Sequence, residues 1–389
     1  MKKNWLVASV LLVFTLGIQA SEQKLPEHWF GEDPNSTITI DYSDWDYILQ
    51  ASVLLSGPPS REVASEDRGS IGTRMKNKYN VKTINAGNKF FYERFRKAPE
   101  LKTAVTNIRE SLQKVPAEVP LNQLKNDEQL AFWLNLYNVV VVDEVNKVYP
   151  EKNLEDFVTD DDGLLERKTV TVEGVALSLN DIQHKVLKVK FNKDPLTLYG
   201  MYQGYIGSPS IRKHAYTGDN VRRTLTANAF DFINSNRGTY PAGKDFLVAN
   251  FYKRNADYFP DFKKDLSGHL KDYLSGSDQY SLDNAKKMVA KIDDWTVTDI
   301  YGSTQNFGGS VANNNAAFLG AFTQIEGSTP ETTEIANTEF MSEMMQSRST
   351  NYGRFSPELM LRLKELKLRN EQNRGTVTVK DLKEESEQN

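Results

Sequence analysis

One histidine in this sequence could take part in catalysis and has apolar neighbours. His184 lies in a stretch with helical periodicity, residues 181–190, where its neighbours on the same face are Leu187 and Phe191. An imidazole ionises near neutral pH, so this residue could accept or donate a proton in a reaction. A histidine with apolar neighbours can equally be a hydrogen-bonded core residue, and both interpretations stay open.

Two asparagines raise the same question. Asn135 and Asn138 lie one turn apart in the middle of an apolar helix. Buried amides need hydrogen-bond partners inside the fold. They either tie neighbouring loops to the helix or line a site, and the pattern favours the first interpretation.

The helix that must position these asparagines spans residues 126–150. Its apolar residues recur at helical spacing, and Pro150 ends the run. The middle is apolar on nearly every side, which is typical of a helix buried in a large core. Asn126, followed three residues later by Gln129, predicts a capping box. The apolar positions at helical spacing are Leu130, Trp133, Leu134, Tyr137, Val141, Val145 and Val148.

Further elements follow this helix. Residues 169–179 predict a β-hairpin around Glu173-Gly174, residues 199–212 form a passage rich in Gly, Tyr and Ser, and residues 282–295 predict another helix. We therefore expect an α+β fold, mostly helical, with a small antiparallel sheet or hairpin. Residues 21–325 are expected to form one large domain, because no convincing linker interrupts them.

Composition excludes several classes of function. The chain has 389 residues, a formal net charge of -4 and a pI near 5.8, so it carries no basic footprint for nucleic acid. It has no cysteine, which excludes disulfides, a cysteine nucleophile and thiolate metal sites. The acidic residues 160–163 match only the middle of a calcium loop, and the four histidines are scattered. We expect neither a metal site nor a cofactor.

The two ends of the sequence carry their own signals. Lys2 and Lys3 precede an apolar run, residues 5–18, that is too short to span a membrane, and Ala20 is a small residue before polar Ser21. Residues 1–20 therefore predict a cleaved signal peptide and a periplasmic or secreted protein. An uncleaved anchor is the alternative, and no later stretch is long enough to be a membrane span.

Residues 326–389 form a polar extension that contains one basic amphipathic stretch, residues 356–369. This stretch is predicted to be a helix that docks on the body of the protein or contacts a partner or a membrane. The residues after it are polar and predicted to be disordered. Its apolar residues alternate with Arg and Lys, and they include Met360, Leu361, Leu363, Leu366 and Leu368.

Three motifs together resemble the bacterial domain of unknown function 547 family. Residues 132–138, Phe-Trp-Leu-Asn-Leu-Tyr-Asn, are similar to its Phe-Trp-Ile-Asn-x-Tyr-Asn helix. Residues 179–184, Leu-Asn-Asp-Ile-Gln-His, are similar to its Leu-x-x-Ile-Glu-His segment. Residues 203–212, Gln-Gly-Tyr-Ile-Gly-Ser-Pro-Ser-Ile-Arg, resemble its Cys-Ala-Ser-x-Gly-Cys-Pro-x-Leu-Arg passage. The resemblance covers roughly residues 120–260.

The family has no established activity, but its cysteines and histidine suggest thiol chemistry of the papain or transglutaminase kind. Such chemistry needs a thiolate within hydrogen-bond reach of an imidazole. Here the two cysteine positions are Gln203 and Ser208, and the glutamate before the histidine is Gln183. A serine hydroxyl is almost never ionised, so these substitutions favour binding over catalysis.

Two hypotheses of different class follow. The first is a binding or scaffold protein in the cell envelope, whose pocket recognises a peptide, a glycan or a partner protein. The second is a hydrolase or transferase with Ser208 as nucleophile, His184 as base and Asn135 or Asn138 as an orienting or oxyanion group. It requires Ser208 and His184 to approach hydrogen-bond distance in one cleft. The residues predicted to bind the ligand in the first hypothesis are Trp133, Tyr137, Tyr202, Gln203, Tyr205 and Arg212.

Overall fold

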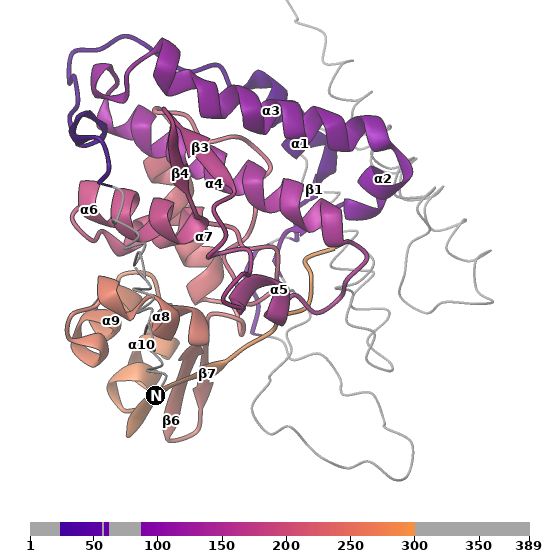
Figure 1. The fold of residues 1–389 in the computed structure, drawn as a ribbon. Helices are drawn as coiled ribbons and strands as arrows, with labels where there is room; N and C mark the ends of the chain where they lie inside the picture. The colour runs from indigo at the N-terminus through magenta and orange to yellow at the C-terminus, as the bar shows by residue number, and fades with distance from the viewer. Residues whose placement is uncertain (1–23, 57, 62–86, 300–389) are drawn as a thin grey trace, which may run out of the picture.

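The computed structural model describes residues 24–56, 58–61 and 87–299 (Figure 1). These residues form a mostly helical α+β structure with small sheets, which confirms the predicted fold class. The predicted signal peptide and the polar extension with its amphipathic stretch lie outside the described residues. The boundaries of the predicted domain at residues 21 and 325 stay predictions for the same reason.

Two long helices, α3 (Pro99–Glu118) and α4 (Asn126–Val148), lie side by side (Figure 1). As predicted, α4 is buried along nearly its whole length. The predicted capping box is absent, because Asn126 is already the first helical residue and Lys125 precedes it without a side-chain cap. Gln129 instead donates hydrogen bonds to the carbonyls of Gly31 and Leu124, both 2.9 Å away.

The N-terminal elements surround one side of this helix pair. Helix α1 contacts α3, and strand β1 follows α1 directly and pairs antiparallel with β2. Because β2 comes just before α2 and α3, this pairing joins the two helical segments on either side of residues 62–86. The elements are η1 (Glu27–Phe30), α1 (Ser43–Ser52), β1 (Val53–Leu54), β2 (Lys89–Phe90), α2 (Tyr92–Lys97) and η2 (Leu121–Gln123).

The predicted hairpin is confirmed as β3 (Val170–Val172) and β4 (Val175–Leu177), which pair antiparallel. Its two-residue turn, Glu173-Gly174, has φ values of 47° and 77°, the left-handed conformation that such turns require. In the helix that follows, the part that carries His184 is a π-helix, η3 (Asp181–Leu187), rather than an α-helix. The other elements between α4 and the C-terminal sheet are α5 (Glu155–Thr159), α6 (Lys188–Lys190), η4 (Pro195–Gly200) and α7 (Val221–Ile233).

The C-terminal part of the described chain is a three-stranded sheet with short helices around it (Figure 1). Its order is β5-β6-β7, with β5 and β6 antiparallel and β6 and β7 parallel. The predicted helix over residues 282–295 is wrong, because residues 287–292 in the middle of that stretch form β7, which pairs with β6, a strand distant in sequence. The elements are β5 (Thr239–Ala242), β6 (Asp245–Ala249), α8 (Asn250–Arg254), η5 (Ala256–Tyr258), α9 (Phe262–Lys271), α10 (Gly276–Asp283) and β7 (Lys287–Ile292).

One continuous hydrophobic core runs through these elements, from Trp29 near the N-terminus to Val297. Within residues 24–56, 58–61 and 87–299, no helix combines the length and the apolar character that crossing a bilayer requires.

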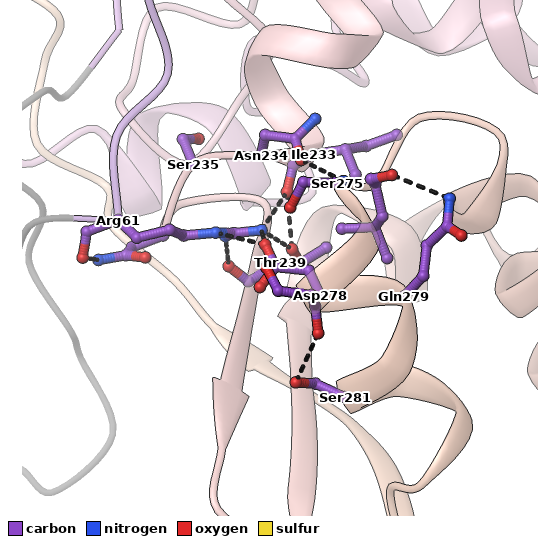
Figure 2. A network of polar contacts seen from close by, with 12 residues as sticks. Arg61, Ile233, Asn234, Ser235, Thr239, Ser275, Asp278, Gln279 and Ser281 are labelled. Carbon is purple, nitrogen blue, oxygen red and sulfur yellow. Dashed lines mark hydrogen bonds and ion pairs between the residues drawn. The ribbon is translucent and has the colours of Figure 1, made fainter.

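A single arginine fastens residues 58–61 to the C-terminal part of the fold (Figure 2). The guanidinium of Arg61 donates to the carboxylate of Asp278 at 2.8 and 3.0 Å, and the side chain of Arg61 is 27% exposed. It also donates to the hydroxyl of Thr239 at 3.0 Å and to the carbonyl of Ile233 at 3.1 Å. The backbone carbonyl of Arg61 accepts from Asn236 at 3.0 Å. This residue therefore joins α7, β5 and α10 to the segment that follows α1 and β1.

We expect Arg61→Ala to lower the free energy of unfolding by about 2–3 kcal/mol, because it leaves a mostly buried carboxylate and several acceptors unpaired. Urea unfolding followed by tryptophan fluorescence measures this loss. The control is Arg96→Ala, whose solvent-exposed ion pair with Glu93 three residues away is screened by water and should contribute little to stability. Equal losses in the two variants would contradict the anchoring role of Arg61.

Candidate functional site

The segment of residues 199–212, where the resemblance places its cysteines, lies directly against α4. Gly200 approaches the helix so closely that a Cβ would lie 2.7 Å from the methyl groups of Leu134. Asn138 binds this segment twice, because its Nδ2 donates to the carbonyl of Gly200 at 3.0 Å and its Oδ1 accepts from the amide of Tyr202 at 3.0 Å. Gly204 has a φ of 87°, which favours glycine at the next bend.

Asn135 does the same for the following loop. Its Nδ2 donates to the carbonyl of Tyr216 at 2.7 Å, and its Oδ1 accepts from the amide of Tyr216 at 3.0 Å. Both asparagines are buried. Their amide groups therefore tie loops to α4, as the first interpretation of these residues predicts, and both ends of each amide are bonded to backbone.

Gln203 occupies the first cysteine position of the resemblance, and its amide is bonded at both ends. Its Nε2 donates to the hydroxyl of Tyr137 at 3.2 Å, and its Oε1 accepts from the hydroxyl of Tyr205 at 2.8 Å. All three side chains are buried. Burial raises the pKa of Tyr205 to about 12, although the Arg254 guanidinium, which donates to its hydroxyl, opposes the rise. The tyrosines are therefore neutral hydrogen-bonding groups at neutral pH.

Ser208, at the second cysteine position, closes a buried turn. Its Oγ donates to the carbonyl of Tyr205 at 2.7 Å and accepts from the amide of Gln203 at 3.3 Å. The residue has no exposed surface. A hydroxyl that donates to a backbone carbonyl in its own turn has its proton engaged there, so the geometry describes a structural serine.

His184 lies on η3 and is oriented by a carboxylate. Its Nδ1 lies 2.9 Å from Oδ2 of Asp257, which Lys188 also contacts, and the histidine side chain is 27% exposed. Burial alone would raise the pKa of Asp257, but the hydrogen bond from Lys188 and the charge of His184 lower it below its ordinary value. Asp257 is therefore an anion that fixes the imidazole. The ring packs edge-on against Tyr258, with centroids 6.1 Å apart.

The residue beside the histidine belongs to a separate buried contact. Gln183 donates to the side-chain carbonyl of Asn255, and its own backbone carbonyl accepts from the hydroxyl of Tyr258 at 3.0 Å. These contacts fasten η3 to the segment that carries Asp257. Gln183 replaces the glutamate of the resemblance and is buried, so it is part of the packing that positions His184.

The catalytic hypothesis requires Ser208 and His184 to meet, and no hydrogen bond joins them in the part of the chain that the structure describes. The partners of Ser208 lie within the same loop against α4. The partner of His184, Asp257, lies on the segment after α8. Asn135 and Asn138 contact neither side chain through a hydrogen bond.

The remaining residues predicted to bind a ligand are mostly inside the core. Trp133 packs against Trp29 with ring centroids 5.2 Å apart, and the hydroxyl of Tyr202 lies 2.9 Å from that of Tyr92. Both side chains are fully buried. Arg212 reaches the surface, where it pairs with Asp231 at 3.0 Å. A ligand role for these residues stays a prediction.

A groove between α1 and α3 is a second candidate site, which the sequence analysis did not identify. It has a volume of about 450 Å³. Its floor includes buried Trp45 and Ile48 of α1, while Asp41, Asp44 and Tyr47 at its edge are exposed. Hydrogen bonds from the backbone and the side chain of Ser43 lower the pKa of Asp41, so the edge carries negative charge. The α3 residues that line this α1–α3 groove are Leu101, Ala104, Asn107, Ile108, Ser111, Leu112 and Val115.

Helix α3 has two faces that could contact other elements, and this feature of its sequence could have predicted the groove. One face of that helix bonds to α4, through Thr106 and Arg109, which contact Asp143. The other face repeats small or apolar residues at intervals of three and four, at Leu101, Ala104 and Ile108 and further along. A helix with two such faces is covered on both sides or leaves a groove. Which of these holds depends on α1, which is distant in sequence.

Among the described residues, no group of three or more His, Asp or Glu side chains is arranged to hold a metal ion.

Comparison with known proteins identifies a family match over part of the chain. Residues 121–233 match the family described as "Protein of unknown function, DUF547". The matched stretch runs from η2 to the end of α7, so it includes α4, the hairpin, His184 and the segment of residues 199–212. No curated protein and no solved structure matches the chain. The match supports placing this stretch in that domain family, and the α1–α3 groove lies outside it.

We expect Asn138→Leu to lower the free energy of unfolding by about 2–4 kcal/mol, because it leaves the carbonyl of Gly200 and the amide of Tyr202 buried without partners. Urea unfolding measures the loss. Asn122→Leu, at an exposed position in η2 outside the groove, is the control and should change stability by less than about 0.5 kcal/mol. If Asn138→Leu were as stable as the control, the amide would not hold the segment.

Proposed function

We propose that this chain is an exported binding protein of the cell envelope, and that it binds a basic amphipathic helix in the α1–α3 groove. The observation that carries the proposal is the groove itself: an open, largely apolar channel between two helices with acidic residues at its edge. Amphipathic helices dock into such grooves by inserting apolar side chains at spacings of three and four residues.

The dimensions of the groove fit such a partner. Leu101 and Val115, the outermost groove residues of α3, are 14 residues apart, so the channel runs for about 21 Å. A helix of three to four turns has the same length. Its apolar face would contact Trp45, Ile48 and Ile108, and its charged flanks would remain at the edge, near Asp41 and Asp44.

Catalysis has weaker support. The positions that would carry thiol chemistry are Gln203 and Ser208, and their side-chain polar groups are bonded to the surrounding framework. His184 is oriented by Asp257, but an oriented imidazole needs a nucleophile or a substrate proton within reach. The contacts of these residues are those of a framework, and we therefore place the proposed function in the groove.

The binding test uses a fluorescein-labelled 14-residue helical peptide of leucine and lysine as probe. The protein in this test is the full chain with the substitutions Leu363→Gln and Leu366→Gln, so that its own amphipathic stretch cannot compete with the probe for the groove. We expect saturable binding in fluorescence anisotropy with a Kd on the order of 1–10 μM, weakening as salt is raised from 50 to 500 mM.

A substitution inside the groove and one beside it make the binding test specific. Ala104→Arg places bulk and positive charge in the groove and should weaken probe binding at least tenfold. Thr103→Arg makes the same change of charge on the same helix at an exposed position outside the groove, and it should leave the Kd within twofold. Absence of saturable binding, or equal effects of the two substitutions, would overturn the proposed function.

Export is proposed from the signal-like residues 1–20. We expect osmotic shock of a Gram-negative host to release the protein, with a mature N-terminus at Ser21 when the released chain is analysed by mass spectrometry. Replacing Lys2 and Lys3 with Glu should retain the unprocessed chain in the cytoplasm. An intact chain that begins at residue 1 in the soluble cytoplasmic fraction of the unmodified protein would contradict export.

A further inference from the structure

We propose that the occupant of the α1–α3 groove is a segment of this same chain, residues 357–369, which closes the groove until a partner displaces it. This inference rests on the proposed function, because it assumes that the groove accepts a basic amphipathic helix. The inference identifies that helix as residues 357–369 of the same chain. The protein would then inhibit its own binding of partners.

The apolar pattern of the segment matches that of the groove. Residues 357–369 read Pro-Glu-Leu-Met-Leu-Arg-Leu-Lys-Glu-Leu-Lys-Leu-Arg. Leu359, Leu363 and Leu366 recur at spacings of four and three, so a helix places them on one stripe. As a helix the 13 residues are about 20 Å long, which is close to the length of the groove. Pro357 suits the first turn of that helix.

Charge complementarity points to the same pairing. The segment has four basic residues and two acidic ones. The described residues that line the groove include Asp41 and Asp44 and no lysine or arginine. A basic helix in the groove therefore gains attraction at the edge, whereas an acidic helix of the same shape would be repelled.

The described chain ends near the C-terminal end of α1, the helix that forms one wall of the groove. Asp299 forms a bridge with Phe90 of β2, and the amide of Phe90 donates to the carbonyl of Thr298 at 2.8 Å. Phe90 also pairs with Val53 of β1, the residue directly after α1. Two adjacent strand spacings separate Val53 from Asp299, a distance of about 10 Å. Figure 1 shows the last described residues rising from β7 towards β1.

The intervening chain is long enough to reach. Residues 300–356 number 57, and a chain of that length with coil-like dimensions has a root-mean-square span of about 40 Å. That span is about twice the 21 Å length of the groove. An intramolecular partner at this tether length has an effective concentration on the order of 1 mM or somewhat below. Against a Kd on the order of μM, the groove would be closed in most molecules.

The absence of cysteine from the chain makes a direct test possible in the full-length protein. Ala104→Cys in the groove is combined in turn with Leu359→Cys, Leu363→Cys or Leu366→Cys, and the purified protein is oxidised with a copper–phenanthroline complex. A disulfide requires Cα atoms within about 7 Å, so it reports close approach. We expect at least one pair to form an intramolecular disulfide, seen as a non-reduced species of altered mobility and confirmed by mass spectrometry.

The matched control moves the first cysteine out of the groove by one residue. Thr103 is exposed on the same helix, and its distance along the chain to the segment is only one residue longer than that of Ala104. We expect disulfides from Ala104→Cys to the segment cysteines to form at least tenfold faster than those from Thr103→Cys. Equal rates, or no disulfide with any of the three positions, would overturn the inference. Disulfide-linked dimers as the main product at low protein concentration would also overturn it, because the occupant would then be a second copy.

A second measurement separates failure of this inference from failure of the proposed function. The leucine–lysine probe should bind the unmodified chain at least tenfold more weakly than the chain with Leu363→Gln and Leu366→Gln. If both chains bind it equally, the groove binds helices but is not closed by its own segment, and only this inference fails. If the variant with an inactive segment does not bind the probe either, the proposed function itself fails.

Discussion

The structure depends on one constraint: α4 is buried on every side and nevertheless carries polar side chains, which must find partners inside the protein. They find them in the backbone of the surrounding segments. Glu128 accepts from the amides of Ile40 and Gly218, both at 2.9 Å, and Asn135 and Asn138 bind the loops between η4 and α7. Each such contact fixes a segment with no regular structure of its own against the helix. The apolar surface of α4 supplies the burial, and its polar residues determine where the loops lie.

This constraint explains why the residues singled out by the family resemblance act as framework. A loop held against a buried helix has its own polar groups enclosed, so Gln203 and Ser208 must bond internally. The residues of this region that reach the solvent, such as His184 and Arg212, lie at its outer edge. A ligand site built on the buried loop would first have to open the core, at the cost of unpaired amides and lost apolar burial. A groove at the edge of the helix layer carries no such cost.

Sequence patterns predicted the local elements well and the distant pairings poorly. Helix α4 and the hairpin were predictable, because apolar periodicity and the Glu173-Gly174 turn are local signals. Strand β7 was predicted as helix, since its conformation is determined by parallel pairing with β6 about 40 residues away. The partners of Asn135 could not be predicted either. A buried amide must form hydrogen bonds, but the sequence does not indicate with which groups. The α1–α3 groove requires two helices separated by residues 62–86, so neither helix alone predicts it.

The groove leaves apolar surface of the protein exposed to water. Apolar side chains on α3 that do not face α4 remain partly exposed, and Tyr47 at the edge of the groove is 62% exposed. At about 25 cal/mol per Å², covering a few hundred Å² of such surface would contribute several kcal/mol, which is comparable to the whole stability of a domain. A helix tethered to the same chain can gain that burial without the loss of translational freedom that a separate partner incurs. A competing partner must therefore cover the groove better than the tethered segment does. Binding would then be selective for partners with a stronger apolar stripe or a higher positive charge, because weaker helices could not displace the segment.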